Sequence, residues 1–135
     1  MIRRVDYFAM QTPNRAGEAH SILAQLRKAG VNLLAFTGFP NGGGSQMDFV
    51  PANSAAFKKV AKANGWKAGK AKRGFLIQGA DRTGALDRTL AKLAAEKINV
   101  TAVDGVTAGK GRFGAILWVK AADVAKASKV LKARK

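Results

Sequence analysis

The sequence predicts an α+β fold made of two copies of one small unit, and three observations lead to this prediction. Matching residues recur at one constant offset, the distance that separates Phe8 from Phe75. Strand-like and helix-like patterns follow one another in the same order in both halves. The 135 residues, of which 47% are hydrophobic, suffice for one ordinary domain or two very small ones with a packed core.

The internal repeat runs without a gap from Phe8 to Gly38 in the first copy and from Phe75 to Gly105 in the second. A fixed internal period indicates repeated structural units, and two units of this length are too few and too long for a solenoid. The repeat therefore predicts two domains, residues 1–71 and residues 72–135. The matched pairs are Phe8 and Phe75, Gln11 and Gln78, Arg15 and Arg82, Gly17 and Gly84, Leu23 and Leu90, Leu26 and Leu93, Asn32 and Asn99, and Gly38 and Gly105.

The first half of copy one predicts a strand, a helix and a second strand. Residues 5–10 are rich in strand-forming side chains, and residues 12–17 form a turn that contains Pro, Asn and Gly. From Glu18 onward, apolar residues recur at the spacing of one helix face, and Gly30 marks the end of that helix. The apolar run over 31–39 predicts the second strand.

The second half of copy one predicts a returning strand and a second helix. A loop rich in glycine occupies 40–45, and residues 46–50 alternate as a strand. Asn53 can cap the next helix through its side-chain oxygen, and that helix ends near Gly65. Residues 66–72 fit a poor fourth strand, a linker, or both.

Copy two repeats this order but has no evident fourth strand after its last helix. A sheet edge would then be left open, and a second chain could cover it, which favours a homodimer. The predicted elements are a strand over 75–79, a turn over 80–84, a helix with Leu86, Leu90 and Leu93 on its core face, a strand over 98–106, a turn over 108–111, a strand over 112–119 and a helix over 122–131.

Each copy therefore follows the order strand-helix-strand-strand-helix, with a possible closing strand in the first. Helices that connect non-adjacent strands cross over with a right-handed sense in nearly every known case. The simplest arrangement is a ferredoxin-like βαββαβ unit, in which an antiparallel sheet carries both helices on one face. The predicted fold is two such units in tandem.

The composition excludes most catalytic machinery. The chain has no cysteine, one histidine and eight acidic residues, and no spacing typical of metal ligands or of a phosphate-binding loop. Residues 109–114 match G-x-G-x-x-G only inside a predicted hairpin, where the motif has no phosphate-binding geometry. We therefore predict a protein that is not an enzyme and has no cofactor and no metal.

The sequence also predicts a cytoplasmic protein without a membrane partner. No apolar run approaches the roughly 20 residues that a membrane-spanning helix needs. The N-terminal residues lead directly into a strand-like pattern and contain no apolar signal core.

The turn before the first helix of each copy carries a motif of its own. Copy one contains Asn14-Arg15-Ala16-Gly17 and later Gly30-Val31-Asn32, and copy two contains Asp81-Arg82-Thr83-Gly84 and later Lys97-Ile98-Asn99. This paired pattern resembles the ACT-domain family, whose members are ferredoxin-like modules that bind small ligands, usually amino acids, and regulate amino-acid metabolism. The resemblance covers nearly the whole chain and makes residues 1–71 and 72–135 two ACT-like domains.

The resemblance implies an amino acid held at the turn between the first strand and the first helix, often across a domain interface. In the serine-sensing members the turn Asn and the second-strand Asn both contact the ligand. Proline and histidine are frequent in the family's turn, but Ala16 and Thr83 stand at the proline position, and Thr12 and Gly79 at the histidine position. The positions that the resemblance marks are Asn14, Arg15, Ala16, Gly17 and Asn32 in copy one, and Asp81, Arg82, Thr83, Gly84 and Asn99 in copy two.

The physical chemistry of the turn fits such a ligand. A glycine lets a ligand approach the backbone closely, and the start of a helix offers amide donors and a positive dipole end to a carboxylate. The side-chain oxygen of Asn14 or Asp81 could accept from an ammonium group. Simpler roles are equally compatible with the pattern: Asn14 and Asp81 as helix caps, Asn32 and Asn99 as turn residues, and both turn arginines as solvated charges.

The net charge of +16 supports a second hypothesis. Clusters of cations neutralise phosphates, so a ferredoxin-like scaffold with basic patches could bind nucleic acid. A third hypothesis is a regulatory subunit that binds no ligand and acts only by pairing with an enzyme. The two basic clusters are Lys58, Lys59, Lys62, Lys67, Lys70, Lys72 and Arg73, and Lys126, Lys129, Lys132, Arg134 and Lys135.

Overall fold

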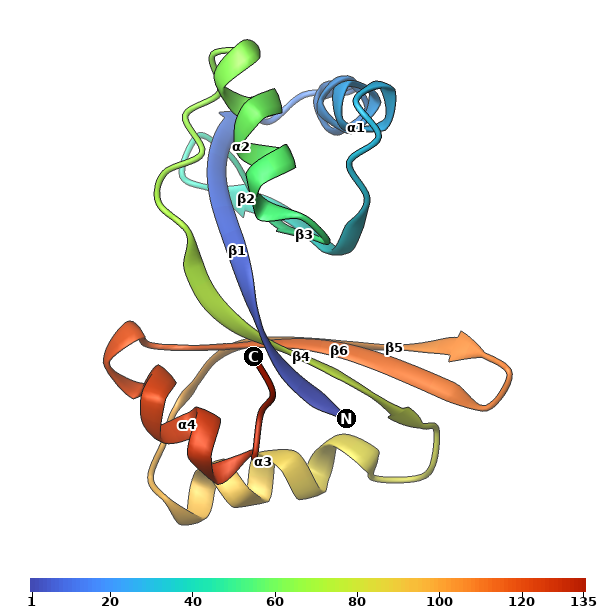
Figure 1. The fold of residues 1–135 in the computed structure, drawn as a ribbon, viewed down its shortest axis with the longest axis vertical. Helices are drawn as coiled ribbons and strands as arrows, with labels where there is room; N and C mark the ends of the chain where they lie inside the picture. Colours follow the sequence, from blue (N-terminus) through green and yellow to red (C-terminus); the bar gives the residue numbers. More distant parts are fainter. The chain divides into compact units, whose positions relative to one another are not determined.

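The structure is a computed structural model that describes residues 1–135, and it confirms the α+β fold with six strands and four α-helices (Figure 1). The order strand-helix-strand-strand-helix occurs twice, and residues 66–71 form a connection rather than a strand of their own. The elements are β1 (Ile2–Pro13), α1 (Glu18–Lys28), β2 (Leu33–Asn41), β3 (Gly44–Pro51), α2 (Ser54–Ala63), β4 (Lys72–Ala80), α3 (Ala85–Ala95), β5 (Val100–Gly109), β6 (Arg112–Val119), a short 3-10 helix (Ala121–Asp123) and α4 (Val124–Val130).

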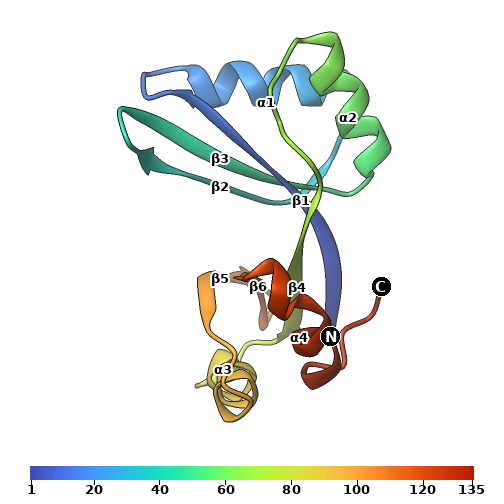
Figure 2. The ribbon, with the colours of Figure 1, turned by 90° about the vertical axis from the view of Figure 1, so that its left-hand side faces the viewer.

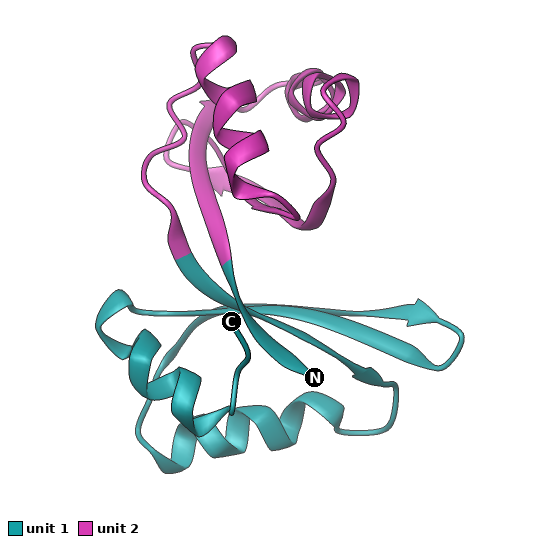
Figure 3. Cartoon of the chain, viewed as in Figure 1, with its two compact units in different colours: residues 1–5, 73–135 teal, residues 6–72 magenta.

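By internal contacts the chain divides into two compact units, drawn in different colours in Figure 3. We call Asp6–Lys72 the first-copy unit, and Met1–Val5 together with Arg73–Lys135 the second-copy unit. The division into ACT-like domains at residues 71 and 72 stays a prediction.

The strand order is β2-β3-β1-β4-β6-β5, and it corrects the prediction of an open edge in copy two. The first residues of β1 occupy that edge. The N-terminal ammonium of Met1 donates to the carbonyl of Gln78 (2.6 Å), and the Gln78 amide donates back to Met1 (2.9 Å). The chain's own N-terminal segment therefore covers the edge that we expected a second chain to cover. An open edge in copy two no longer supports a homodimer.

The C-terminal end of the chain lies along the same segment. The amide of Arg4 donates to the carbonyl of Arg134 (2.6 Å), and the amide of Arg134 donates to the carbonyl of Ile2 (3.0 Å). The resulting bridge between Arg3 and Arg134 is parallel. The second-copy unit thus binds both termini through backbone hydrogen bonds.

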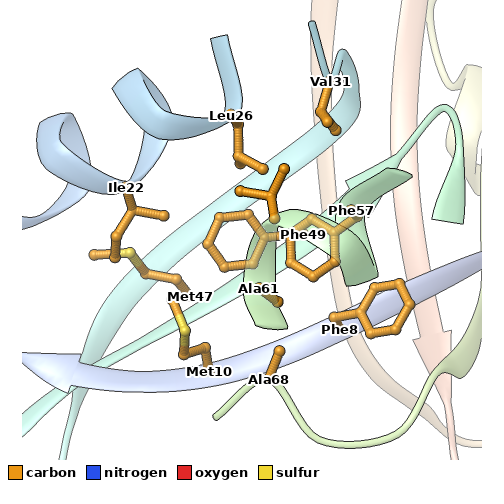
Figure 4. Packing of buried hydrophobic residues seen from close by; sticks show 11 residues of the cluster. Phe8, Met10, Ile22, Leu26, Val31, Met47, Phe49, Phe57, Ala61 and Ala68 are labelled. Atoms are coloured by element: carbon orange, nitrogen blue, oxygen red, sulfur yellow. The ribbon is translucent and has the colours of Figure 1, made fainter. Parts of the chain in front are cut away.

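An aromatic cluster forms the core of the first-copy unit (Figure 4). Phe8 of β1 stacks on Phe57 of α2 with ring centroids 4.8 Å apart, and Phe57 contacts Phe49 of β3 at 5.3 Å. All three rings are buried, and each such side chain contributes about 1.5–3 kcal/mol by leaving water. Both helices cover the same face of β1, β2 and β3 because alternate strand residues point to that face (Figure 2).

The second-copy unit has a mainly aliphatic core, which contains one buried aromatic residue, Phe75. Phe75 of β4 lies opposite Leu117 of β6, and both pack with Leu93 of α3 and Ala127 of α4. These four residues have no exposed surface. The predicted helix face is confirmed, since Leu93 is buried and Leu86 and Leu90 pack against the same cluster.

The helices begin in two different ways. The predicted cap of α2 is confirmed, because the side-chain oxygen of Asn53 accepts a hydrogen bond from the amide of Ala56 (3.0 Å). Helices α1 and α3 begin instead at Gly17 and Gly84, without a side-chain cap. These two helices have 11 residues each, and no helix of the chain has the length and apolar character needed to cross a membrane.

Candidate functional site

The turn between the first strand and the first helix has the same backbone geometry in both copies. Gly17 has φ of 88° and Gly84 has φ of 72°, the left-handed region in which a side chain is strained. The amide of Glu18 donates to the carbonyl of Arg15 (3.3 Å), and the amide of Ala85 donates to Arg82 (3.0 Å). Glycine at this point therefore serves to reverse the chain and start the helix.

Asn14 and Asp81 do not cap their helices. The cap positions belong to the two glycines, and no amide at the start of either helix donates to a capping side chain. Both side chains are exposed on the turn. The capping role that the sequence left open for Asn14 and Asp81 is therefore wrong.

The two turn arginines differ in their surroundings. The Nε atom of Arg15 donates to the Oε1 atom of Glu18 at 2.7 Å, an exposed ion pair worth at most about 1 kcal/mol. In the second copy the residue that corresponds to Glu18 is Ala85, so Arg82 has no such neighbour. A ligand carboxylate would compete with Glu18 for Arg15.

A groove of about 440 Å³ opens beside the turn of the first copy, and we call it the α1 groove. Three segments form it: the turn, the first residues of α1, and the hairpin of β2 and β3. Phe36, Met47 and Ala19 give it apolar walls, and polar side chains form its rim. The lining residues are Pro13, Asn14, Arg15, Gly17, Glu18, Ala19, His20, Phe36, Gly38, Phe39, Pro40, Ser45 and Met47.

The structure brings together only part of the predicted site. Asn14, Arg15 and Gly17 line the α1 groove, whereas Ala16 lies on the same turn without lining it. Asn32 lies at the opposite end of α1, in a separate hollow of about 400 Å³ with Leu23, Leu26, Arg27, Gly30, Val31 and Leu33. The carbonyl of Asn32 accepts a backbone hydrogen bond from Ala52 (2.9 Å).

In the second copy the predicted residues also fall into two places. Asp81, Arg82, Thr83 and Gly84 are exposed on the turn before α3, where the amide of Asp81 donates to the carbonyl of Gly111 (2.8 Å). Asn99 is exposed just before β5, after the end of α3.

Sequence reasoning missed the apolar side of the groove. Phe36 and Met47 come from β2 and β3, far from the turn in sequence, and they were read only as strand residues. Ala19 was read as one position of the buried helix face. The repeat contained one signal for this part of the groove. Gly38, which lines the groove, is matched by Gly105, so neither copy has a side chain at this strand position.

The titratable side chains that line the α1 groove are Arg15, Glu18 and His20. His20 is exposed on its rim, and no group of three His, Cys, Asp or Glu side chains is placed to hold a metal ion. Away from the groove lining, burial, and secondly the carboxylate of Asp48, raises the pKa of the Tyr7 phenol.

A third hollow, of about 360 Å³, lies where α2 meets the connection after it. Lys58, Lys62 and Lys67 surround it together with the ring of Trp66. The ammonium of Lys58 is 6.0 Å from the centre of the Phe8 ring, at the outer limit of a cation–π contact. Part of the first basic cluster therefore lies next to an aromatic surface.

No family model and no curated protein sequence matches the chain. Among solved structures it is similar to a protein from Bacteroides thetaiotaomicron, with a TM-score of 0.79 and 19% identity, over 98% of this chain and 88% of that one. It is also similar to the regulatory subunit of aspartate kinase from Thermus thermophilus in its ligand-free form, with a TM-score of 0.63 and 12% identity, over 98% and 93% of the two chains.

A third solved structure is aspartate kinase from Clostridium acetobutylicum, described as an allosteric enzyme, with a TM-score of 0.55 and 17% identity. The match covers 97% of this chain but 33% of that enzyme. At these identities the likeness is one of fold. It confirms that the chain has the ferredoxin-like, ACT-like fold that the sequence predicted.

Proposed function

We propose that this protein is a non-enzymatic regulatory module that binds a small amino acid-like ligand in the α1 groove. The observation that carries the proposal is the position of the groove. Its apolar walls lie beside the first turn of α1, where the amides of Ala19 and His20 have no acceptor within the helix. A concave, mostly apolar site with a few polar groups is typical of small-molecule binding.

The groove suits an α-amino acid whose side chain is apolar or aromatic. The carboxylate would accept from the amides at the start of α1, where the helix dipole is positive. The ammonium would donate to the side-chain oxygen of Asn14, and the side chain would lie against Phe36 and Met47. The turn of the second copy, with Asp81, Arg82, Thr83 and Gly84, and the two second-strand residues Asn32 and Asn99 stay predictions as ligand contacts.

Regulation would follow from a difference in ligand affinity between two arrangements of a complex. The solved structures with this fold include the regulatory subunit of an aspartate kinase and an allosteric aspartate kinase, and this supports an enzyme as the partner. Pairing of two copies as a homodimer is part of the proposal, as is a cytoplasmic location.

Nucleic-acid binding is a second candidate function, favoured by the hollow around Trp66. Lysines next to a partly exposed aromatic ring, here Trp66, are the combination that binds a phosphate backbone and stacks on a base. Such binding would weaken steeply as salt is raised, whereas an amino acid bound at the α1 groove would depend little on salt.

The test is a thermal-shift screen against the twenty amino acids, with a short DNA and a short RNA oligomer in parallel, at low and high salt. A ligand that binds the native state raises Tm by mass action, by several degrees at a hundredfold excess over Kd. We expect a response to one or a few apolar amino acids.

Two matched variants locate the site. Asn14→Ala removes a groove side chain and should abolish a shift caused by binding at the α1 groove, whereas Asp81→Ala changes the equivalent residue of the second copy, which does not line that groove, and should leave that shift intact. No response to any amino acid, together with a salt-sensitive response to an oligomer, would refute the amino-acid module in favour of nucleic-acid binding. No change in Tm with any amino acid or oligomer would instead favour a regulatory subunit that binds no ligand and acts only by pairing with an enzyme.

A further inference from the structure

We infer that the two copies are unequal, and that only the first-copy turn opens on a ligand groove. In the second copy, the side chains of Leu86 and Phe113 fill the corresponding space. The identity of the ligand rests on the proposed function above, but the inequality rests on packing alone.

The internal repeat and the strand register identify the corresponding positions. Ala19 of α1 matches Leu86 of α3 at the offset of the repeat. In the hairpins, Gly38 lies opposite Met47, and Gly105 lies opposite Ala115.

The register of the first strands places one further pair. Thr12 of β1 lies opposite Ser45 of β3, and Gly79 of β4 lies opposite Phe113 of β6. Because Thr12 and Gly79 correspond in the repeat, Ser45 corresponds to Phe113. Two small groove residues of the first copy are thus replaced by two large ones in the second.

The space above the matched hairpin glycines shows the consequence. A Cβ atom on residue 105 would lie only 2.8 Å from the Cδ1 atom of Leu86, so the leucine lies directly over Gly105. A Cβ atom on residue 38 would find only the Cγ atom of Met47, at 4.0 Å. The helix side chain that covers the glycine in one copy is absent in the other.

Phe113 fills the neighbouring part of the same space. A Cβ atom on residue 79 would lie 3.2 Å from the Cε1 atom of Phe113, so the ring crosses the strand just before the turn. Its counterpart Ser45 lines the α1 groove and leaves it open. Phe113 and Leu86 both pack against the core of the second-copy unit.

The difference between the copies is not simply that the first copy has smaller side chains at every matched position. Met47, which is larger than its counterpart Ala115, is buried on the strand, whereas the second copy has its larger residues at Leu86 of α3 and Phe113 of β6. Met47 leaves the space next to the turn open, whereas Leu86 and Phe113 close the corresponding space. Ala19 and Ser45 are therefore the residues that determine whether this fold carries a groove at the turn.

A double-mutant cycle tests the packing without any ligand. Gly38→Ala should leave Tm unchanged or raise it slightly, and Gly105→Ala should lower Tm relative to it, because its Cβ meets Leu86. In a Leu86→Ala background, Gly105→Ala should no longer lower Tm. Equal effects of the two alanines, or no rescue by Leu86→Ala, would overturn the inference.

Ligand binding is then mapped by amide NMR, with an equimolar mixture of the twenty amino acids as the probe. We expect shifts at Gly17, Ala19 and Gly38 and none at Gly84, Leu86 and Gly105. Ala19→Leu should remove the shifts, and the double variant Leu86→Ala/Phe113→Ser should create shifts in the second copy.

The two proposals fail in different ways in this experiment. Shifts at both turns of the unchanged chain would overturn the inequality and leave the amino-acid module standing. Absence of shifts at either turn would refute the amino-acid module, while the double-mutant cycle still decides the inequality.

Discussion

At the scale of single residues, the backbone near the α1 groove depends on glycine for two separate reasons. Gly17 is needed for its positive φ, and nothing lies within 4 Å of the place where its Cβ would be. Gly44, at the start of β3, has an ordinary φ but no room, because its Cβ would lie 2.6 Å from the carbonyl oxygen of Thr12. One glycine therefore sets a conformation, and the other permits two strands to approach.

Gly44→Ala should destabilise the protein. The clash is with a backbone atom of β1, so β3 must move away from the strand it pairs with, and forcing extra atoms into a packed site costs about 1–3 kcal/mol. We expect Tm to fall by several degrees. Gly43→Ala is the control, since its Cβ meets nothing within 4 Å, and an equal fall in both variants would contradict the steric explanation.

At the scale of elements, the helices differ in whether a side chain caps their first turn. Helix α2 satisfies an amide at its start with the side chain of Asn53. Helix α1 begins at Gly17 without a side-chain cap, so amides of its first turn stay available beside the groove. Helix α3 also begins without a side-chain cap, so the uncapped start of α1 supports ligand binding only together with the groove beside it.

Asn53→Ala should cost about 1 kcal/mol of stability, because the amide of Ala56 loses its acceptor. Asn53→Ser keeps an oxygen that can cap the helix and should recover most of the loss. Urea unfolding measures both, and α1 groove binding should be unaffected. A loss in the serine variant as large as that in the alanine variant would show that capping is not the cause.

At the scale of the whole molecule, β1 takes part in both copies. Its residues from Phe8 to Pro13 pair with β3. Its first residues form backbone hydrogen bonds with Gln78 of β4 and with Arg134 near the C-terminus. The strand that copy two lacks at the end of its own sequence is therefore supplied from the start of the chain. The sheet edge of copy two is therefore covered by a segment of the same chain and not by a second molecule.

A chain that begins at Asp6 should loosen the second-copy unit selectively. The amides of Gln78 and Arg134 would lose their acceptors on Met1 and Ile2, and loss of one hydrogen bond accelerates exchange by about tenfold. Hydrogen exchange followed by NMR measures this. The amides of Val31 and Trp66, bonded within the first-copy unit, are the internal control. Uniform acceleration at all four amides would contradict a selective role.

The sequence by itself determined the repeat, the order of the elements and the special turn at each first helix. These features depend on local patterns: the apolar face of α3 through Leu86, Leu90 and Leu93, and glycine where the chain needs positive φ. The fold followed from them because few topologies connect such elements. The cap of α2 was also predictable, since a cap joins residues only three positions apart.

Only the tertiary structure decided where the groove lies and which strand closes copy two. The groove needs Ala19, Gly38 and Ser45 from three segments to leave one space empty, and no local pattern records what a distant side chain fills. Asn14 and Asn32 were expected together but lie at opposite ends of α1, because a helix separates them. Local preference sets the elements, and the volume left between residues distant in sequence sets the site.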